Sequence, residues 1–283
     1  MSLSIVIPAK NESATIGGVI TAAKEAWPDA ELIVVDDGSS DDTADVARAA
    51  GATLVQHPES LGNGAAVKAG ARKAQGKIIA LMDGDGQHDP KELAPLFEKL
   101  DEGYHMVVGA RDSGSHANMG RLFANGLYNG IASLLTGRRI PDLTSGFRVA
   151  RARLFKEFLY LLPNGFSYPT TITMAFLRSG YPICYVPIKA ATRVGKSHIR
   201  PIRDGVRFMA IIFKVATLYS PLKIFLPISG IFFLTGVGYY AYTYATTGRF
   251  TNMSMLIISA AVIVFLIGLI SEQITALTYK RSG

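Results

Sequence analysis

The chain is poor in cysteine and tryptophan, with Cys184 and Trp27 as the only examples among 283 residues. A single cysteine excludes an intrachain disulfide and suits a reducing compartment. No cluster of cysteines and histidines surrounds Cys184 in the sequence. We therefore interpret it as core filling.

Charge is absent from two long stretches near the C-terminus, Ile224–Gly248 and Phe250–Ser271. Each exceeds the roughly 20 residues that a helix needs to cross about 30 Å of hydrocarbon. A pair of buried core helices is the alternative, but helices this long and apolar all round favour a membrane. We predict transmembrane helices at about 224–247 and 252–277, within a membrane unit of residues 221–283.

Basic residues flank these stretches unevenly. The loop between them carries only Arg249, whereas six basic residues precede the first stretch and two follow the second: Lys196, Arg200, Arg203, Arg207, Lys214 and Lys223, then Lys280 and Arg281. Cytoplasmic loops are enriched in Lys and Arg. We therefore expect a multi-pass protein of the cell (inner) membrane, with both termini and the N-terminal domain in the cytoplasm.

The net charge of +7 raises the question of nucleic acid. The basic residues gather beside the apolar stretches, and no nucleic-acid-binding module is recognisable. A lipid bilayer with an anionic leaflet explains them better, so we expect no nucleic-acid partner. Residues 199–220 place basic side chains at helical spacing beside an apolar stripe, which predicts an interfacial helix. An amphipathic helix packed on the domain is the open alternative.

The first eighty residues alternate strand and helix patterns. Strands are expected at Leu3–Ile7, Leu32–Val35, Thr53–Gln56 and Ile78–Met82, and helices at Ser13–Ala26, Asp41–Ala50 and Asn63–Gln75. This order predicts a parallel sheet with helices on both faces.

Polar residues follow three of these strands, and the carboxyl ends of parallel strands share one crevice. The segment that ends in Asp83-Gly84-Asp85 is the most informative. Alternate residues of an extended chain point the same way, so both carboxylates can converge on a hard divalent cation while Gly84 lets the backbone come close. For this pair alone, a solvated Asp-Gly turn is the alternative.

Six short segments resemble, in order and spacing, the family 2 glycosyltransferases with a GT-A fold: Ile7–Glu12, Val34–Ser39, Gly62–Ala65, Met82–His88, Val108–Arg111 and Thr144–Phe147. The resemblance covers roughly residues 3–200 and is greatest to the polyprenyl-phosphate branch, which includes dolichol-phosphate mannose synthases. It implies an α/β fold with a Rossmann-like, mostly parallel sheet and flanking helices. Residues 1–198 would form a cytoplasmic catalytic domain.

The resemblance also implies a donor site for a UDP- or GDP-sugar. Asp37 would accept an N–H of the base, although Asp36 beside it has a structural alternative. Asp83, Asp85 and Gln87 would bind Mg²⁺ or Mn²⁺ at the diphosphate. The remaining donor-binding residues implied by the family are Pro8, Ala9, Asn11, Glu12, Gly84, Arg193 and Lys196.

On the acceptor side, Arg111 and Arg121 match positions that bind lipid phosphate in dolichol-phosphate mannose synthases, and Ser145 joins them as a phosphate-binding residue. With Asp85, these two arginines are the expected catalytic residues. Asp142 has three open roles: orienting an arginine, contacting the sugar, or forming a structural turn.

Relatives that glycosylate hydroxyl groups carry a carboxylate base near residues 165–171, where this chain has none. The Gln-x-x-Arg-Trp motif of processive synthases is absent too, because Trp27 is the only tryptophan. A phosphate acceptor, with a second pKa near 6, is already largely ionised at about pH 7 and needs no base.

We therefore expect inverting, metal-dependent transfer of one sugar from a nucleotide-diphosphate donor to a polyprenyl phosphate, such as undecaprenyl or dolichyl phosphate. The alternatives are transfer to a hydroxyl acceptor of a glycolipid or polysaccharide, and a non-catalytic nucleotide-binding membrane protein. A second copy of the chain, as a homo-oligomer, is among the possible partners.

Overall fold

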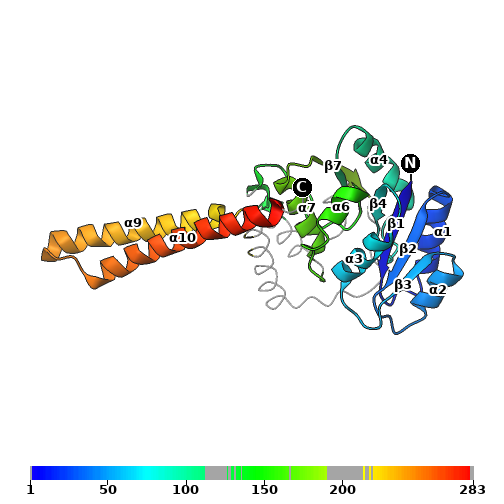
Figure 1. Ribbon diagram of the computed structural model, residues 1–283, viewed down its shortest axis with the longest axis horizontal. Coiled ribbons are helices and arrows are strands. Elements are labelled where there is room, and N and C mark those ends of the chain that lie inside the picture. The colour runs from blue at the N-terminus through cyan, green and yellow to red at the C-terminus, as the bar shows by residue number, and fades with distance from the viewer. Residues whose placement is uncertain are drawn as a thin grey trace. The chain divides into compact units, whose positions relative to one another are not determined.

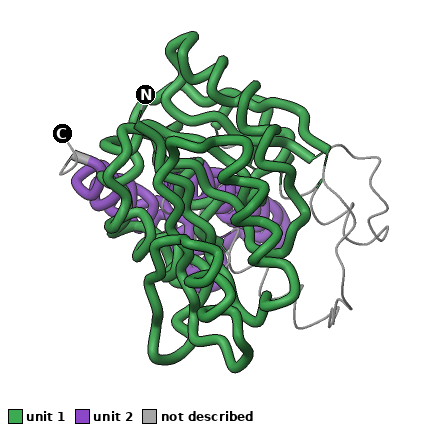
Figure 2. The backbone as a smooth tube through the Cα atoms, turned by 90° about the vertical axis from the view of Figure 1, so that its right-hand side faces the viewer, with its two compact units in different colours: residues 1–200 green, residues 201–283 purple. Residues whose placement is uncertain are grey.

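The computed structural model describes residues 2–111, 126, 129–130, 132–134, 136–165, 167–189, 213, 217 and 219–280. The chain divides into two compact units, residues 1–200 and 201–283, which Figure 2 shows in different colours. Each unit is described by itself.

The first unit is built on a seven-stranded sheet with the order β3-β2-β1-β4-β6-β5-β7. Its strands are β1 (Leu3–Ala9), β2 (Glu31–Asp36), β3 (Thr53–Gln56), β4 (Ile78–Leu81), β5 (Met106–Arg111), β6 (Arg148–Arg151) and β7 (Ile183–Ile188). Strand β6 pairs antiparallel with both β4 and β5, and the other pairings are parallel. The mostly parallel GT-A-like sheet expected from the sequence is confirmed.

Helices cover both faces of this sheet (Figure 1). They are α1 (Ile16–Ala26), α2 (Thr43–Ala49), α3 (Asn63–Lys73), the short 3₁₀ helix η1 (Pro90–Glu92), α4 (Leu93–Asp101), α6 (Ala152–Glu157) and α7 (Tyr168–Arg178). All seven residues of β1 are buried, as expected for a strand covered on both faces. Ile5 and Ile7 belong to the core shared with α1 and α4, whereas Val6 faces α3, where a Cβ on Gly70 would lie 2.3 Å from its Cγ1.

The strand and helix expectations hold to within a few residues. The largest difference is at the first helix, which was expected from Ser13 and begins at Ile16. The intervening residues form a turn in which the Glu12 carbonyl accepts from the backbone N–H groups of Thr15 and Ile16, at 3.0 and 2.9 Å. This turn holds residues 12–15 at the carboxyl end of β1.

The second unit contains two long antiparallel helices, α9 (Leu222–Thr247) and α10 (Asn252–Lys280). Gly248 ends α9 in the left-handed conformation, with φ of 66°. Both helices are long and apolar enough to cross a membrane, and only 11% and 17% of their most apolar windows are buried. That low burial is unlike the core helices of a soluble protein, so the expected pair of spans matches two candidate membrane helices.

The two helices approach closely where one of them has a small residue. Ser229 of α9 donates to the Ala261 carbonyl of α10 at 2.9 Å. A Cβ on Gly236 would lie 2.7 Å from Ile258 Cγ1, and one on Gly268 would lie 2.7 Å from Phe225 Cβ. Small residues of this kind allow membrane helices to pack backbone against backbone.

Candidate active site

The loop after β1 is fastened to the loop after β2. Asn11, which has a positive φ of 54°, donates its backbone N–H to Ser39 Oγ at 2.9 Å and accepts from Ser40 N at 2.8 Å. The N–H of Glu12 donates to Thr43 Oγ1 at 2.8 Å. Ser39 and Ser40 therefore both contact Asn11. The structure thus brings two of the expected donor-binding segments together.

Asp37 is buried and accepts four hydrogen bonds. Its Oδ1 accepts from His57 Nδ1 at 2.8 Å and Leu61 N at 2.9 Å, and its Oδ2 accepts from Ser60 Oγ at 2.7 Å and Gly62 N at 2.8 Å. Burial alone would raise the pKa of this carboxyl, but these hydrogen bonds outweigh it and lower the pKa. Asp37 thereby fixes the segment that leads into α3, and its role toward a nucleobase stays a prediction.

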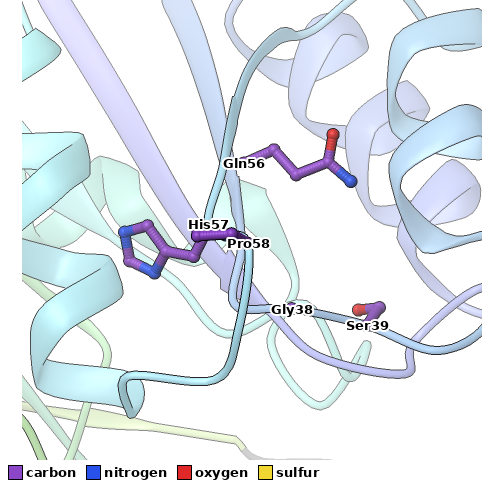
Figure 3. Close-up of a pocket in the computed structure, with 5 residues that line it drawn as sticks. All are labelled: Gly38, Ser39, Gln56, His57 and Pro58. Carbon is purple, nitrogen blue, oxygen red and sulfur yellow. The ribbon is translucent and has the colours of Figure 1, made fainter.

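Asp36 is fully buried and has a structural position. Its two oxygens accept from Ser39 N at 3.1 Å and from Gln56 Nε2 at 3.2 Å. A cavity of about 340 Å³ lies at this end of β2 and β3, lined by Gly38, Ser39, Gln56, His57 and Pro58. In Figure 3 the Gln56 side chain extends toward Ser39, while the His57 ring turns to the other side.

The two carboxylates of the Asp-Gly-Asp segment follow β4 and are partly exposed. Gly84 is packed tightly, since a Cβ there would lie 3.2 Å from Ile16 Cδ1, and its carbonyl accepts from Thr15 Oγ1 at 2.8 Å. Asp85 Oδ1 accepts from Gln87 N at 3.1 Å across Gly86, which has φ of 73°. This tight turn puts Gln87 close to Asp85.

These residues fit a divalent cation bound jointly with a diphosphate. Within the described part of the chain, no group of three or more His, Cys, Asp or Glu side chains could hold a metal. Mg²⁺ is usually bound in just this incomplete way, by one or two carboxylates with substrate phosphates and water supplying the other ligands. Asp83, Asp85 and the Gln87 amide would hold it, and a Cβ on Gly84 would crowd Ile16 and Ala9.

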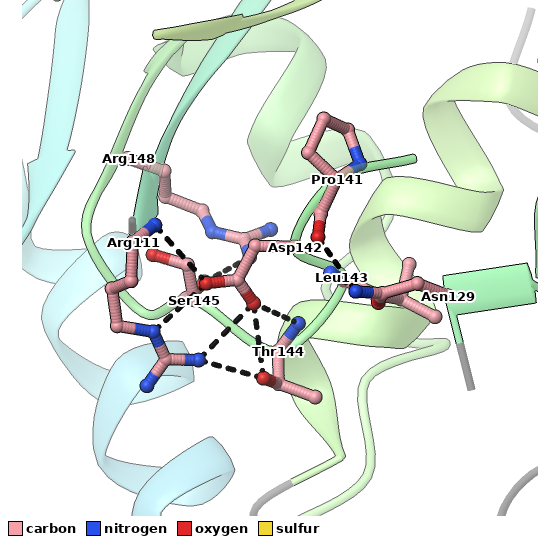
Figure 4. Close-up of polar contacts among 8 residues, drawn as sticks. All are labelled: Arg111, Asn129, Pro141, Asp142, Leu143, Thr144, Ser145 and Arg148. Carbon is pink, nitrogen blue, oxygen red and sulfur yellow. Dashed lines mark hydrogen bonds and ion pairs between the residues drawn. The ribbon is translucent and has the colours of Figure 1, made fainter. Parts of the chain in front are cut away.

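Arg111, at the end of β5, is held by Asp142 (Figure 4). Its Nε donates to Asp142 Oδ2 at 2.8 Å, and its Nη2 donates to Asp142 Oδ1 at 3.1 Å and to Thr144 Oγ1 at 2.8 Å. Of the three roles open to Asp142, this geometry favours orienting an arginine. A forked pair is also among the stronger charge-assisted contacts.

Electrostatic interactions connect the Arg111–Asp142 pair with the loop at residues 83–88 that follows β4. His88 is buried and stacks on Phe147, with ring centroids 4.7 Å apart. Burial lowers its pKa, and the charges of Asp85, Arg111 and Asp142 also act on it. The charge of Asp83 acts in turn on Arg111. One expected metal ligand, Asp83, therefore acts electrostatically on the expected phosphate-binding Arg111.

Three of the expected site residues, Arg121, Arg193 and Lys196, lie outside the described residues, as does most of the expected interfacial helix at 199–220. Ser145 is described and is buried, and its hydroxyl has no hydrogen-bond partner. Pro8 and Ala9 end β1, where the Ala9 carbonyl accepts from Asp37 N at 2.9 Å, and Glu12 lies in the loop that follows.

Sequence reasoning missed two residues behind the site. Arg148 is fully buried and donates to the carbonyl of Ser145, and Gly146 has Asp83 packed against it. Gly146 belongs to the Thr-Ser-Gly-Phe segment that carries the family resemblance, and Arg148 directly follows that segment. The signal that could have found Arg148 is an arginine at the start of an otherwise apolar strand pattern, Arg148-Val149-Ala150.

Comparison with protein families identifies the chain. Residues 4–159 match the model of glycosyl transferase family 2, and residues 220–277 match the GtrB C-terminal hairpin. The chain therefore belongs to glycosyl transferase family 2 and is a glycosyltransferase, carrying a C-terminal hairpin of two candidate membrane helices.

Several curated proteins are similar over most of the chain. Glycosyltransferase AglJ of Haloferax volcanii is 27% identical over 98% of this chain and 94% of its own length. The dolichyl-phosphate hexose transferase of the same organism is 29% identical over 75% of this chain and 93% of its own. The polyprenol monophosphomannose synthase of Mycolicibacterium smegmatis is 27% identical, covering 75% and 84% respectively.

Among solved structures, the chain is similar to glucosyl-3-phosphoglycerate synthase from Mycobacterium tuberculosis in complex with Mn²⁺, uridine diphosphate and phosphoglyceric acid. The TM-score is 0.61 at 26% identity, covering 76% of this chain and 78% of the other. This likeness agrees with a GT-A-like mixed sheet with flanking helices.

Proposed function

We propose that this glycosyltransferase moves one sugar from a nucleotide-diphosphate donor, a UDP- or GDP-sugar, to a polyprenyl phosphate, with inversion at the anomeric carbon. The observation that carries the proposal is Arg111, which a buried aspartate holds where the charge of Asp83 acts on it. A fixed cation next to a candidate diphosphate-metal site suits an anionic acceptor. The names of two relatives, a dolichyl-phosphate hexose transferase and a polyprenol monophosphomannose synthase, support the same acceptor class.

In this proposal the loops after β1 and β2 bind the nucleoside, and Asp83, Asp85 and Gln87 hold Mg²⁺ or Mn²⁺. The solved neighbour that contains Mn²⁺ and uridine diphosphate supports a divalent cation. When bound, the cation would neutralise the charge that develops on the diphosphate. Arg193 and Lys196 are proposed to act on the donor phosphates.

Arg111, Arg121 and Ser145 are proposed to bind the acceptor phosphate. Its oxygen attacks the anomeric carbon as the bond to the diphosphate breaks, so the sugar is transferred in one displacement. No proton has to be removed from an ionised phosphate. Asp142 is poorly suited to be a base: burial would raise its pKa, but the hydrogen bonds and charge of Arg111 lower it below its ordinary value of 3.8.

The membrane part of the proposal has residues 1–198 as a cytoplasmic catalytic domain, 199–220 as an interfacial helix and 221–283 as a transmembrane hairpin. The division of the chain near residue 200 and the family hairpin at 220–277 support these boundaries. The C-terminal third of α9, which precedes the loop that contains Arg249, carries four tyrosines: Tyr239, Tyr240, Tyr242 and Tyr244. Aromatic residues favour the membrane interface, which supports a membrane-spanning α9.

A single assay tests the proposal. Membranes containing the protein are incubated with polyprenyl phosphate and a panel of radiolabelled UDP- and GDP-sugars, with Asp85→Ala as the inactive control. We expect one donor to yield a glycolipid that mild acid hydrolyses, as a sugar phosphodiester does. An acid-stable glycoside would instead indicate a hydroxyl acceptor, and no product with any donor would favour a non-catalytic role.

A further inference from the structure

Arg148 is the largest fully buried side chain of the protein's described part, and its charge lies in the core of the first unit. Among the described residues, no aspartate or glutamate forms an ion pair with it. Its Nε has no hydrogen-bond partner either. Burying a cation without a paired anion costs stability, which the hydrogen bonds of the guanidinium partly offset.

The guanidinium joins two segments that border the site. Its Nη2 donates to the carbonyl of Ser145, and its Nη1 donates to the Pro169 carbonyl at 3.1 Å and to Thr173 Oγ1 at 3.2 Å. The first contact anchors the turn before β6, and the other two anchor the first turns of α7. Figure 4 shows the Arg148 side chain extending past Asp142 toward Ser145.

The turn that Arg148 bonds, at Ser145 and Gly146, packs against the carboxylate of Asp83. A Cβ on Gly146 would lie 3.1 Å from Asp83 Oδ2 and 3.4 Å from Oδ1. It would also lie 3.4 Å from the hydroxyl of Tyr168, the first residue of α7. The carboxylate of Asp83 is thus seated against the backbone of Gly146, between the two segments that Arg148 joins.

The charges around Arg148 are consistent with this position of Asp83. Burial lowers the pKa of Arg148, while Tyr168, Tyr185, Asp142 and Asp83 act in the opposite direction. The two carboxylates that act on Arg148, Asp142 and Asp83, therefore both belong to the candidate site.

We propose that Arg148, acting through the turn at Gly146, is a positioning residue that sets the orientation of Asp83 toward the divalent cation. This inference rests on the proposed metal role of Asp83. Groups behind metal ligands commonly change metal affinity by about 10- to 100-fold when they are removed. The competing interpretation is that Arg148 serves the stability of the fold alone.

The test measures Mn²⁺ binding by the full-length protein in lipid nanodiscs, from the loss of the free Mn²⁺ signal in electron paramagnetic resonance, with and without UDP. The variants are Arg148→Met, Arg148→Lys and Gly146→Ala. Two substitutions serve as matched controls. Arg151→Met removes an arginine of the same strand that donates to the Leu100 carbonyl, and Gly18→Ala adds a methyl group where nothing lies within 4 Å.

We expect Arg148→Met and Gly146→Ala to raise the Mn²⁺ dissociation constant by about tenfold or more, and Arg148→Lys by less. The controls should bind as the wild type does. The Mn²⁺ concentration for half-maximal transfer should rise in the same order, and excess Mn²⁺ should restore kcat of Gly146→Ala. If Arg148→Met does not fold, the Mn²⁺ affinities of Gly146→Ala and Arg148→Lys distinguish the positioning role from a purely structural one.

Wild-type Mn²⁺ affinity in folded Gly146→Ala and Arg148→Lys would overturn the inference and leave Arg148 as a stability residue. Failure of the proposed function gives a different result. In that case the wild type itself would bind no Mn²⁺ with UDP, or would transfer sugar at full rate in EDTA.

Discussion

Arg111 and Asp142 form a forked pair, in which Nε and Nη2 of the arginine donate to the two carboxylate oxygens at 2.8 and 3.1 Å. The carboxylate is buried and the guanidinium remains partly exposed, with side-chain exposures of 11% and 38%. The buried Asp142 carboxylate thus fixes the orientation of the more accessible Arg111 guanidinium. This relationship makes Arg111 suitable for binding an anion and Asp142 unsuitable for accepting a proton.

The first prediction concerns Asp142→Asn, which keeps the shape but removes the charge. We expect the KM for polyprenyl phosphate to rise by about 10- to 100-fold, because a charge-assisted hydrogen bond contributes about 1.5–3 kcal/mol. The KM for the donor should change little. Steady-state kinetics with each substrate varied in turn measure both, and Asp45→Asn, from the exposed pair with Arg48, is the control. A collapse of kcat without a change in acceptor KM would contradict the positioning role.

The second prediction compares Arg111→Ala with Arg111→Lys. Alanine should weaken acceptor use by about 100-fold or more, whereas lysine keeps the charge but loses the fork and should show an intermediate loss. Arg121→Ala should resemble Arg111→Ala, on the strength of the family pattern. Equilibrium binding of the nucleotide checks the donor side. If donor affinity fell while acceptor dependence stayed unchanged, the two sites would be assigned the wrong way round.

The third prediction concerns the acidic limb of the pH–rate profile. With an ionised phosphate as nucleophile, kcat/KM should fall below about pH 6, as the acceptor takes up a proton. A difluorophosphonate acceptor, which is more acidic, should move the limb to lower pH. The measurement is kcat/KM for both acceptors at saturating metal, on wild type and Asp142→Asn. A limb that ignored the acceptor and disappeared in Asp142→Asn would make Asp142 the general base.

The fourth prediction is a stability difference that depends on pH. The pKa of Asp142 in the folded protein lies below its ordinary value of 3.8, so the unfolded chain binds its proton more readily. The resulting stabilisation is present above about pH 4 and is lost as the pH falls through the folded pKa. The difference in Tm between wild type and Asp142→Asn should therefore shrink on acidification. A difference that stayed constant down to about pH 2 would exclude this linkage.

The fifth prediction tests the hairpin. Gly236→Leu should separate α9 from α10, because its Cβ would lie 2.7 Å from Ile258, whereas Gly238→Leu meets nothing within 4 Å and should be tolerated. Thermal unfolding in nanodiscs should show a loss of about 1–3 kcal/mol for the first variant alone, the usual cost of overpacking. Equal stability of the two variants would show that this contact is absent.

The sequence by itself predicted the parallel part of the sheet, because β1, β2 and β4 are short apolar runs between helical patterns. It also predicted the two long apolar helices, since runs without charge are visible in composition. The antiparallel insertion of β6 between β4 and β5 was not predicted. Four residues, Arg148–Arg151, carry no periodicity long enough to specify a partner strand.

The pairing of Asp83 with Asp85 could be proposed from spacing alone, because alternate residues of an extended chain share a direction. Only the tertiary structure decided that Asp142 is the partner of Arg111, 31 positions away, and that the turn at Gly146, bonded by Arg148, lies against Asp83. Hydrophobic periodicity is a property of residues that are close together in the sequence. A hydrogen bond between side chains far apart in the sequence depends on how the strands pair. The sequence therefore determined which chemistry the protein carries, and the fold determined which residues hold it in place.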